Sequence, residues 1–186
     1  MTLFEMKEKI LWLIEEGNPE SPYLTEDPDI SGKLNPVIDQ LQFELARIKK
    51  LPRFLKLPVR AGELVDFAAL RKACGEDVYQ LGTVSGVPYR IRAAGSVLEF
   101  TEDGVASVEC FVYPVRITGQ TPETQILSLS ADCLEILPYG AAADLLKNDA
   151  TAQYGKIYAD RYERMLQRLD PRYGIGGITF EGGVRL

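Results

Sequence analysis

The sequence predicts an α+β fold in which a small antiparallel β-sheet is inserted between two pairs of helices. Both terminal parts of the chain carry apolar side chains three and four residues apart, which is the spacing of one helix face. The middle part instead alternates apolar and polar residues. With 186 residues, of which 46% are hydrophobic, the chain is long enough to bury a core. We therefore expect a single domain over residues 1–172, followed by a glycine-rich arm over residues 173–186.

Two helices are expected before the sheet. Thr2 and Glu5 match the capping-box pattern, in which each side chain accepts a hydrogen bond from the backbone N–H of the other residue. This pattern predicts a first helix over residues 2–16. Helical spacing over residues 28–50 predicts a second helix. Because proline has no N–H donor, we expect Pro36 to bend or restart this second helix.

A β-rich insertion is predicted over about residues 57–129. Residues 61–74 fit either a short helix or a loop, and Asp103 with Gly104 is a pair that tight hairpins prefer. We expect an antiparallel meander of three or four strands, whose last strand is the longest and has the part near Pro114 at an edge. The alternation predicts strands at residues 78–84, 87–92, 97–101 and 105–117, with a further short strand at 126–129.

Two further helices are expected after the sheet, over residues 131–147 and 150–169. Pro138 is interpreted as the first residue of a helix or as a kink. The small residues at positions 140–143 allow another backbone to approach closely. The two segments are therefore predicted to form an αα-hairpin.

Three tyrosines lie four residues apart on the last predicted helix. Tyr154, Tyr158 and Tyr162 therefore share one helix face. One interpretation is a packing stripe inside the chain, which is the favoured one. The other is a subunit interface, where tyrosine is enriched. The two interpretations differ only in what covers the rings.

The arm over residues 173–186 combines glycines with large apolar side chains. Glycine makes the arm costly to order alone, and exposed apolar side chains make it costly to leave in water. Binding to a neighbouring subunit, by strand addition or in a groove, resolves both costs. A tail folded back on its own domain and a frayed terminus are the alternatives. The interface candidates in the arm are Tyr173, Ile175, Ile178 and Phe180.

Composition argues against several kinds of chemistry. The chain has no histidine, which removes the commonest general base and metal ligand. Its three cysteines are widely spaced, so buried free thiols are expected rather than a disulfide framework or a zinc site. The carboxylates fall at predicted caps and turns, where a structural role suffices. We expect no enzymatic activity, no cofactor and no metal.

The net charge of −6 opposes nonspecific nucleic-acid binding as the main activity. One short stretch is nevertheless basic, and we interpret it as a solvated helix end and loop. The residues of this basic stretch are Lys49, Lys50, Arg53, Lys56 and Arg60. No apolar run approaches the roughly 20 residues of a membrane helix. Four glutamates within the first 17 residues argue against a signal peptide, so a cytoplasmic protein is expected.

Three segments carry a resemblance to a known family. They cover residues 30–50 (ISGKLNPVIDQLQFELARIKK), 89–116 (YRIRAAGSVLEFTEDGVASVECFVYPVR) and 137–169, the last including LPYGAAADLLKND and QYGKIYADRYERMLQRL. In pattern and in order of elements, the chain resembles bacteriophage and prophage head-to-tail adaptor proteins, including the tail tubular protein A group.

The resemblance implies a structural virion component without catalytic residues. It implies a homo-oligomeric ring, typically a dodecamer, that docks on the phage portal and receives the tail proteins at the head–tail junction of the virion. It implies neither a membrane partner nor sequence-specific nucleic-acid binding. The glycine-rich arm departs from the family's pattern.

Two other functions stay open from the sequence. The first is a small-molecule-binding domain or enzyme that uses carboxylates and tyrosines in a cleft between sheet and helices, where a deep pocket with converging acids is expected. The second is nucleic-acid contact through the basic stretch, which predicts binding that weakens steeply with salt.

Overall fold

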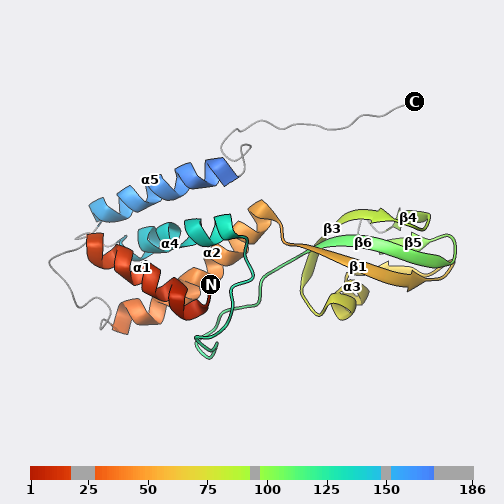
Figure 1. The fold of residues 1–186 in the computed structure, drawn as a ribbon, viewed down its shortest axis with the longest axis horizontal. Coiled ribbons are helices and arrows are strands. Elements are labelled where there is room, and N and C mark those ends of the chain that lie inside the picture. Colours follow the sequence, from red (N-terminus) through yellow and green to blue (C-terminus); the bar gives the residue numbers. More distant parts are fainter. Residues whose placement is uncertain (18–27, 93–96, 148–151, 170–186) are drawn as a thin grey trace.

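A computed structural model describes residues 1–17, 28–92, 97–147 and 152–169, and shows a helical bundle beside a β module (Figure 1). The helical bundle consists of α1, α2, α4 and α5, and the β module spans residues 52–112. The β module is inserted between α2 and α4, as the sequence predicts. The α+β fold class is therefore confirmed.

The four bundle helices lie within two residues of their predicted bounds. α1 begins with the expected capping box, in which the Thr2 N–H donates to Glu5 Oε2 at 2.8 Å and the Glu5 N–H donates to Thr2 Oγ1 at 3.2 Å. Ser130 caps α4 by accepting from the N–H of Cys133. The helices are α1 (Leu3–Gly17), α2 (Pro28–Lys49), α4 (Ala131–Leu145) and α5 (Ala152–Leu169).

Both internal prolines lie within continuous helices. α2 runs through Pro36 without restarting, so that part of the prediction is wrong. Pro138 is neither the first residue of α4 nor its end, but a buried residue in its interior. The neighbours of α4 account for this position: α4 is the central helix and packs against α1, α2 and α5. Burial against three helices stabilises a helix that propensity alone disfavours.

The bundle encloses the first of two hydrophobic cores. α1 contributes one face, and the small residues of α4 let its neighbours approach. A Cβ atom at Gly155 of α5 would lie 2.7 Å from the carbonyl oxygen of Leu146, so glycine permits this contact between the helices of the predicted αα-hairpin. The largest fully buried side chains of this core are Leu3, Met6, Ile10, Ile14, Ile38, Leu45, Leu137 and Leu166.

The β module contains six strands in two three-stranded antiparallel sheets, with orders β1-β6-β3 and β2-β5-β4. Side chains from both sheets and from α3 form the second core, which includes Leu70, Leu98, Phe100, Val108 and Cys110. The elements are β1 (Pro52–Val59), β2 (Leu64–Asp66), α3 (Phe67–Cys74), β3 (Val78–Ser85), β4 (Tyr89–Arg92), β5 (Val97–Phe100) and β6 (Gly104–Val112).

The predicted meander is wrong in three respects. β6 is the longest described strand, as expected, but it pairs with β1 and β3 and not with the strand before it, so the strands do not follow one another as in a meander. It ends at Val112, so Pro114 lies beyond the strand. Asp103 and Gly104 do not form a hairpin, because β5 and β6 belong to different sheets. The Asp103 carboxylate instead accepts a hydrogen bond from the backbone N–H of Ala61 at 2.8 Å.

The β structure also begins earlier than the predicted residue 57. β1 starts at Pro52 and pairs along its whole length with β6. Its two prolines, Pro52 and Pro58, are tolerated because β1 is an edge strand. The ambiguous residues 61–74 form β2 and α3, with Asp66 as the cap of α3 and Gly75 ending it at a φ of 75°. Residues 126–129 form no strand beyond a single bridge between Ile126 and Thr2.

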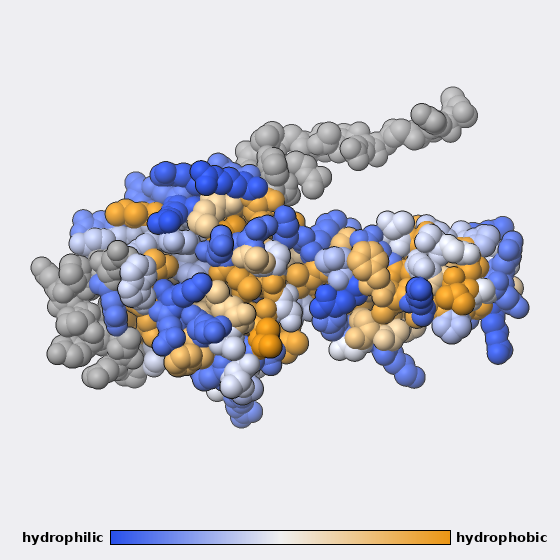
Figure 2. Space-filling view, viewed as in Figure 1, coloured by the Kyte–Doolittle hydropathy of each residue, from blue (hydrophilic) through white to orange (hydrophobic). Residues whose placement is uncertain are grey.

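Apolar side chains reach the surface of both parts. Figure 2 shows orange surface over the bundle and over the β module on the face drawn. The most exposed large apolar residues are Phe4 and Trp12 of α1, Phe54 of β1, Leu64 of β2, Ile91 of β4, Val105 of β6, Val115, Ile126, and Ile157 of α5. No described helix combines the length and the apolar character that crossing a bilayer requires.

Candidate functional site

A groove on the helical bundle is the strongest candidate for an interaction surface. We call it the bundle groove; it has a volume of about 430 Å³, and residues of α1, α4 and α5 line it. Trp12 stands at its rim with 62% of its surface exposed. The lining residues are Lys9, Trp12 and Leu13 of α1, Leu134, Glu135, Pro138 and Tyr139 of α4, and Arg161 and Met165 of α5.

The position of Trp12 follows from helical geometry. The residues of α1 that enter the core include Ile10, Leu13 and Ile14, and Trp12 lies off this stripe. The indole therefore points away from the core and towards the groove. An exposed tryptophan beside a hollow is unusual because tryptophan is mostly buried, and it is a residue type that dominates binding energy at protein interfaces.

Arg161 of α5 and Tyr139 of α4 also line the bundle groove. The guanidinium of Arg161 lies over the Tyr139 ring, 4.2 Å from its centroid. The Tyr158 hydroxyl donates to the backbone carbonyl oxygen of Leu13 at 2.7 Å, which ties α5 to α1. The groove is therefore aromatic and aliphatic inside, with charged groups of both signs at its edge. This chemistry fits an apolar side chain presented by another protein surface.

The tyrosine ladder lies next to this groove and faces the chain's own core. Tyr158 is buried, and the Tyr162 ring packs directly on Gly140 of α4. Tyr154 is partly buried against the same core. The packing interpretation therefore describes the ladder within one chain. A role for Tyr154 or Tyr162 in a subunit interface stays a prediction.

The other predicted interface residues, Tyr173, Ile175, Ile178 and Phe180, lie outside the described residues.

The sequence interpretation placed the basic stretch on a helix end and a loop; the helix end is present at Lys49, but most of the expected loop is a strand. Lys49 ends α2 and lies 3.7 Å from Asp132, whereas Lys50 lies over the Phe111 ring. Arg53 and Lys56 belong to β1, and Arg53 forms a two-point ion pair with Glu76. An extended strand separates charges by about 3.3 Å per residue, so these cations spread along the β module.

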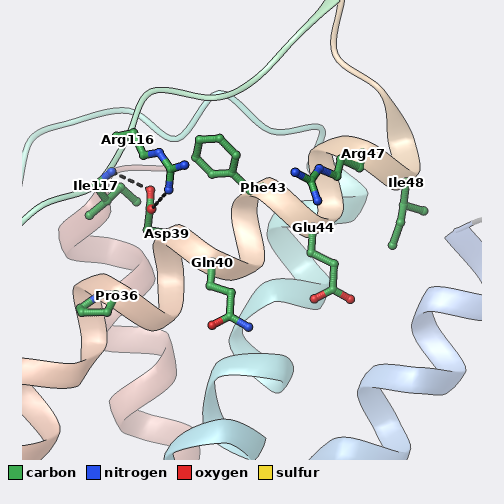
Figure 3. A pocket seen from close by; sticks show the side chains of 9 residues that line it. All are labelled: Pro36, Asp39, Gln40, Phe43, Glu44, Arg47, Ile48, Arg116 and Ile117. Carbon is green, nitrogen blue, oxygen red and sulfur yellow. Dashed lines mark hydrogen bonds and ion pairs between the residues drawn. The ribbon is translucent and has the colours of Figure 1, made fainter. Parts of the chain in front are cut away.

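A second groove, of about 720 Å³, lies where α2 meets the chain leaving β6 (Figure 3). We call it the junction groove. Arg116 and Arg47 stand on either side of Phe43, and the Arg116 guanidinium lies 4.1 Å from the centroid of that ring. Beside the Phe43 ring, Tyr113 stacks on Tyr79 with ring centroids 4.4 Å apart.

The acid in the junction groove already has three hydrogen-bond donors. Asp39 accepts from the Ile117 N–H at 2.8 Å, from Arg116 at 2.9 Å and from Gln42 Nε2 at 3.0 Å. Gln42 also donates to the Val115 carbonyl oxygen. Asp39 and Gln42 therefore anchor the segment after β6 onto α2. This is a structural role for a carboxylate, since its oxygens are committed to fixed donors.

The described residues hold no group of three or more Cys, Asp or Glu side chains placed to bind a metal ion. Cys110 and Cys133 are buried free thiols, as expected, and burial raises the pKa of both.

Comparison with known protein families and with characterised proteins finds no match for this chain.

Sequence reasoning missed both grooves. A local signal existed for Trp12, because the chain's single tryptophan lies off the apolar stripe of its own helix. No local signal existed for the junction groove. Its partners Asp39 and Arg116 are 77 residues apart, and only the fold brings them together.

Proposed function

We propose that this chain is a structural assembly protein of the head-to-tail adaptor kind, which self-associates into a ring, docks on a phage portal and receives a tail. The bundle groove with the exposed Trp12 is the observation that carries the proposal. The resemblance of residues 30–50, 89–116 and 137–169 to adaptor proteins supports the identity of the partners.

The surface has the features that a head-to-tail contact needs. The groove lies on the bundle, and exposed apolar residues such as Phe54 and Val105 lie on the β module. A contact between two different surfaces of identical chains repeats from one subunit to the next, and it closes into a ring when the rotation permits. A ring of this kind explains why a single subunit exposes apolar residues on both its bundle and its β module.

Light scattering of the full chain at increasing concentration tests this function. We expect a multimer whose dissociation constant rises roughly thirtyfold in the Trp12→Ala variant, because truncating a central interface tryptophan costs about 2 kcal/mol. Phe4→Ala is the matched control, since Phe4 is an exposed aromatic residue of the same helix that does not line the groove. A chain that stays monomeric at high micromolar concentration, or equal effects of the two variants, contradicts the proposal.

The alternative is a small-molecule-binding domain or enzyme, with the junction groove as its site. Its volume favours this alternative, but its lining comes from α2 and from Arg116 and Ile117 after β6, and not from either sheet. The three donors on Asp39 weigh against it, because a carboxylate held by fixed donors is not poised for proton transfer. Isothermal titration showing a metabolite that binds wild-type chain but not Phe43→Ala chain would replace the assembly proposal.

A further inference from the structure

The second sheet of the β module ends in a strand whose apolar side is uncovered. Val65 of β2 pairs with Leu98 of β5, and Leu98 pairs with Ile91 of β4, so the three side chains form one row on one face. Their exposed fractions are 5%, 0% and 60%, respectively. The core therefore covers this row as far as β5 and leaves its end on β4 in water.

The next row shows the same break. Phe100 is fully buried, whereas its partner Tyr89 is more than a third exposed. β4 is also an edge strand, so one side of its backbone has no partner strand among the described residues. Unlike β1, β4 contains no proline within its bounds. An edge with free backbone groups and exposed apolar side chains accepts an added strand.

The arm of this chain contains a segment with the same alternation of apolar and polar residues as β4. Residues 178–181 read Ile-Thr-Phe-Glu, with two glycines on either side. In a strand, Ile178 and Phe180 share one face, and Thr179 and Glu181 share the other. β4 reads Tyr-Arg-Ile-Arg, which places its apolar residues on one face and its arginines on the other.

Pairing these two segments buries the uncovered row. Phe180 beside Ile91 extends the apolar face of the sheet by one strand, and Glu181 then lies on the side of Arg90 and Arg92. The flanking glycines end the added strand, because glycine is unfavourable in strand interiors. Cross-strand apolar pairs and opposite charges each stabilise such pairing.

The length of the arm limits how far residues 178–181 lie from the end of α5. Eight residues lie between Leu169, the end of α5, and Ile178, and the nine residue steps that join the two span at most about 32 Å when extended. Figure 1 shows α5 over the bundle and β4 in the other half of the molecule.

We propose that residues 178–181 of one chain add as a strand to the β4 edge of a neighbouring copy, with Phe180 covering Ile91 and Glu181 facing the β4 arginines. This inference rests on the proposed self-association, and it names the surface that receives the arm. It makes the arm a link between successive subunits of the assembly.

A charge exchange between two full-length variants tests the pairing. Glu181→Arg alters the arm, and Arg90→Glu alters the edge, where Arg90 lies opposite Glu99 of β5. Arg90 is chosen because Arg92 is engaged in an ion pair with Glu99 inside the sheet. Each variant alone is expected to self-associate roughly tenfold more weakly, because a favourable cross-strand charge pair becomes a repulsive one. An equimolar mixture should recover most of the wild-type affinity, since each arm then meets an edge of opposite charge.

Two reversals outside the proposed contact are the controls. Arg185→Glu lies on the arm beyond the segment, and Lys56→Glu lies on the other sheet of the β module. Both should leave self-association within about twofold of the wild type. Hydrogen exchange gives a readout that does not depend on charge: the amides of residues 89–92 should gain protection in the assembly and lose it when residues 173–186 are removed.

The outcomes separate the two proposals. Assembly that is unchanged in both charge variants overturns the strand addition and leaves the proposed function standing. A mixture that recovers nothing, while the double variant Glu181→Arg with Arg90→Glu does recover, places the arm on its own chain and overturns the link between copies. A chain that is monomeric throughout overturns both proposals.

Discussion

Asp39 shows how one polar side chain positions a long connection. Its carboxylate accepts hydrogen bonds from Ile117, Arg116 and Gln42, and its side chain is largely buried. The chain after β6 carries no secondary structure at this point, so side-chain hydrogen bonds take the place of a sheet ladder.

Removing this carboxylate should destabilise the bundle. In Asp39→Ala, the buried N–H of Ile117 loses its acceptor, and we expect the free energy of unfolding to fall by about 2 kcal/mol. Asp39→Asn is the matched control because its amide oxygen can still accept from Ile117, so we expect about half that loss. Urea unfolding with linear extrapolation measures both variants. Equal stability of the alanine variant and the wild type would show that water replaces these contacts.

The three thiols should differ in reactivity. Burial raises the pKa of Cys110 to about 11 and also raises the pKa of Cys133, whereas Cys74 is only half-buried. Because the thiolate is the reactive form, Cys74 should react first with a thiol reagent at pH 8, and the two buried thiols should react only on unfolding. Labelling followed by peptide mass spectrometry distinguishes the three. Simultaneous labelling of all three in the folded chain would contradict their burial.

The same burial has a consequence for stability. Cys110 ionises at a higher pH in the folded chain than in the unfolded chain, so its contribution is fully present below the unfolded pKa, which lies near 9. The free energy of unfolding should therefore fall as pH rises from about 9 to about 11. Urea unfolding at several pH values should show a shallower fall in Cys110→Ala than in the wild type.

At the scale of elements, three helical glycines provide a graded test of packing. A Cβ atom at Gly155 would lie 2.7 Å from the carbonyl oxygen of Leu146, and at Gly140 it would lie 2.8 Å from the Tyr162 ring. Alanine at either position should destabilise the chain by about 1–3 kcal/mol, more at Gly155 because a backbone atom yields less than a side chain. At Gly32 nothing lies within 4 Å, so alanine there should stabilise by about 0.5–1 kcal/mol. Thermal unfolding of the three variants ranks them.

The ranking itself is the discriminating result. If Gly155→Ala proves as stable as the wild type, the close approach of α5 to the end of α4 is wrong. If Gly32→Ala destabilises the chain, that face of α2 is covered by another surface.

The helices were predictable from the sequence, and the sheet pairing was not, for a physical reason. Helical periodicity is local, so the apolar residues of α1 and α5 reveal their faces within one or two turns. Pairing of β1 with β6 joins Pro52 to Phe111 across the length of the whole module, and nothing near Pro52 indicates its partner. The prolines and cations of β1 also imitate a loop, although an edge strand tolerates them.

The features of the candidate site differ in the same way: those within one helix were predictable from the sequence, and those formed by several elements were not. The tyrosine ladder was visible because Tyr154, Tyr158 and Tyr162 share one helix. The bundle groove needs three helices in their final arrangement, and the β4 edge becomes visible only when the exposed Ile91 is compared with the buried Leu98 beside it. Interaction surfaces are properties of the assembled fold, whereas stripes are properties of single elements.

At the scale of the whole molecule, two hydrophobic cores meet at a small aromatic junction. The bundle core and the β-module core are separate clusters, and among the described residues the partly buried Leu129 is the one that packs against both. Between the two cores, the Tyr113 ring stacks on the Tyr79 ring, and its centroid lies 5.0 Å from the centroid of the Phe43 ring of α2. The Tyr79 hydroxyl donates to the Ala46 carbonyl oxygen at 3.1 Å, which ties β3 to α2.

This junction should set the angle between the two parts without holding either part together. Tyr113→Ala removes the middle ring, so we expect both cores to stay folded while the bundle and the β module move relative to each other. Small-angle X-ray scattering should then fit an ensemble of angles instead of one. Circular dichroism should show unchanged helix and strand content.

Tyr113→Phe is the matched control for that change. It keeps the ring stack and removes only the hydroxyl that accepts from Arg47 Nε at 3.2 Å, so a single angle should be retained. Because a ring of identical subunits closes at only one angle between its contact surfaces, the alanine variant should also form open or irregular multimers in light scattering. A Tyr113→Ala chain with the scattering profile and the assembly of the wild type would show that the remaining contacts, which include Leu129 and the hydrogen bond from Tyr79 to Ala46, fix the angle without the aromatic stack.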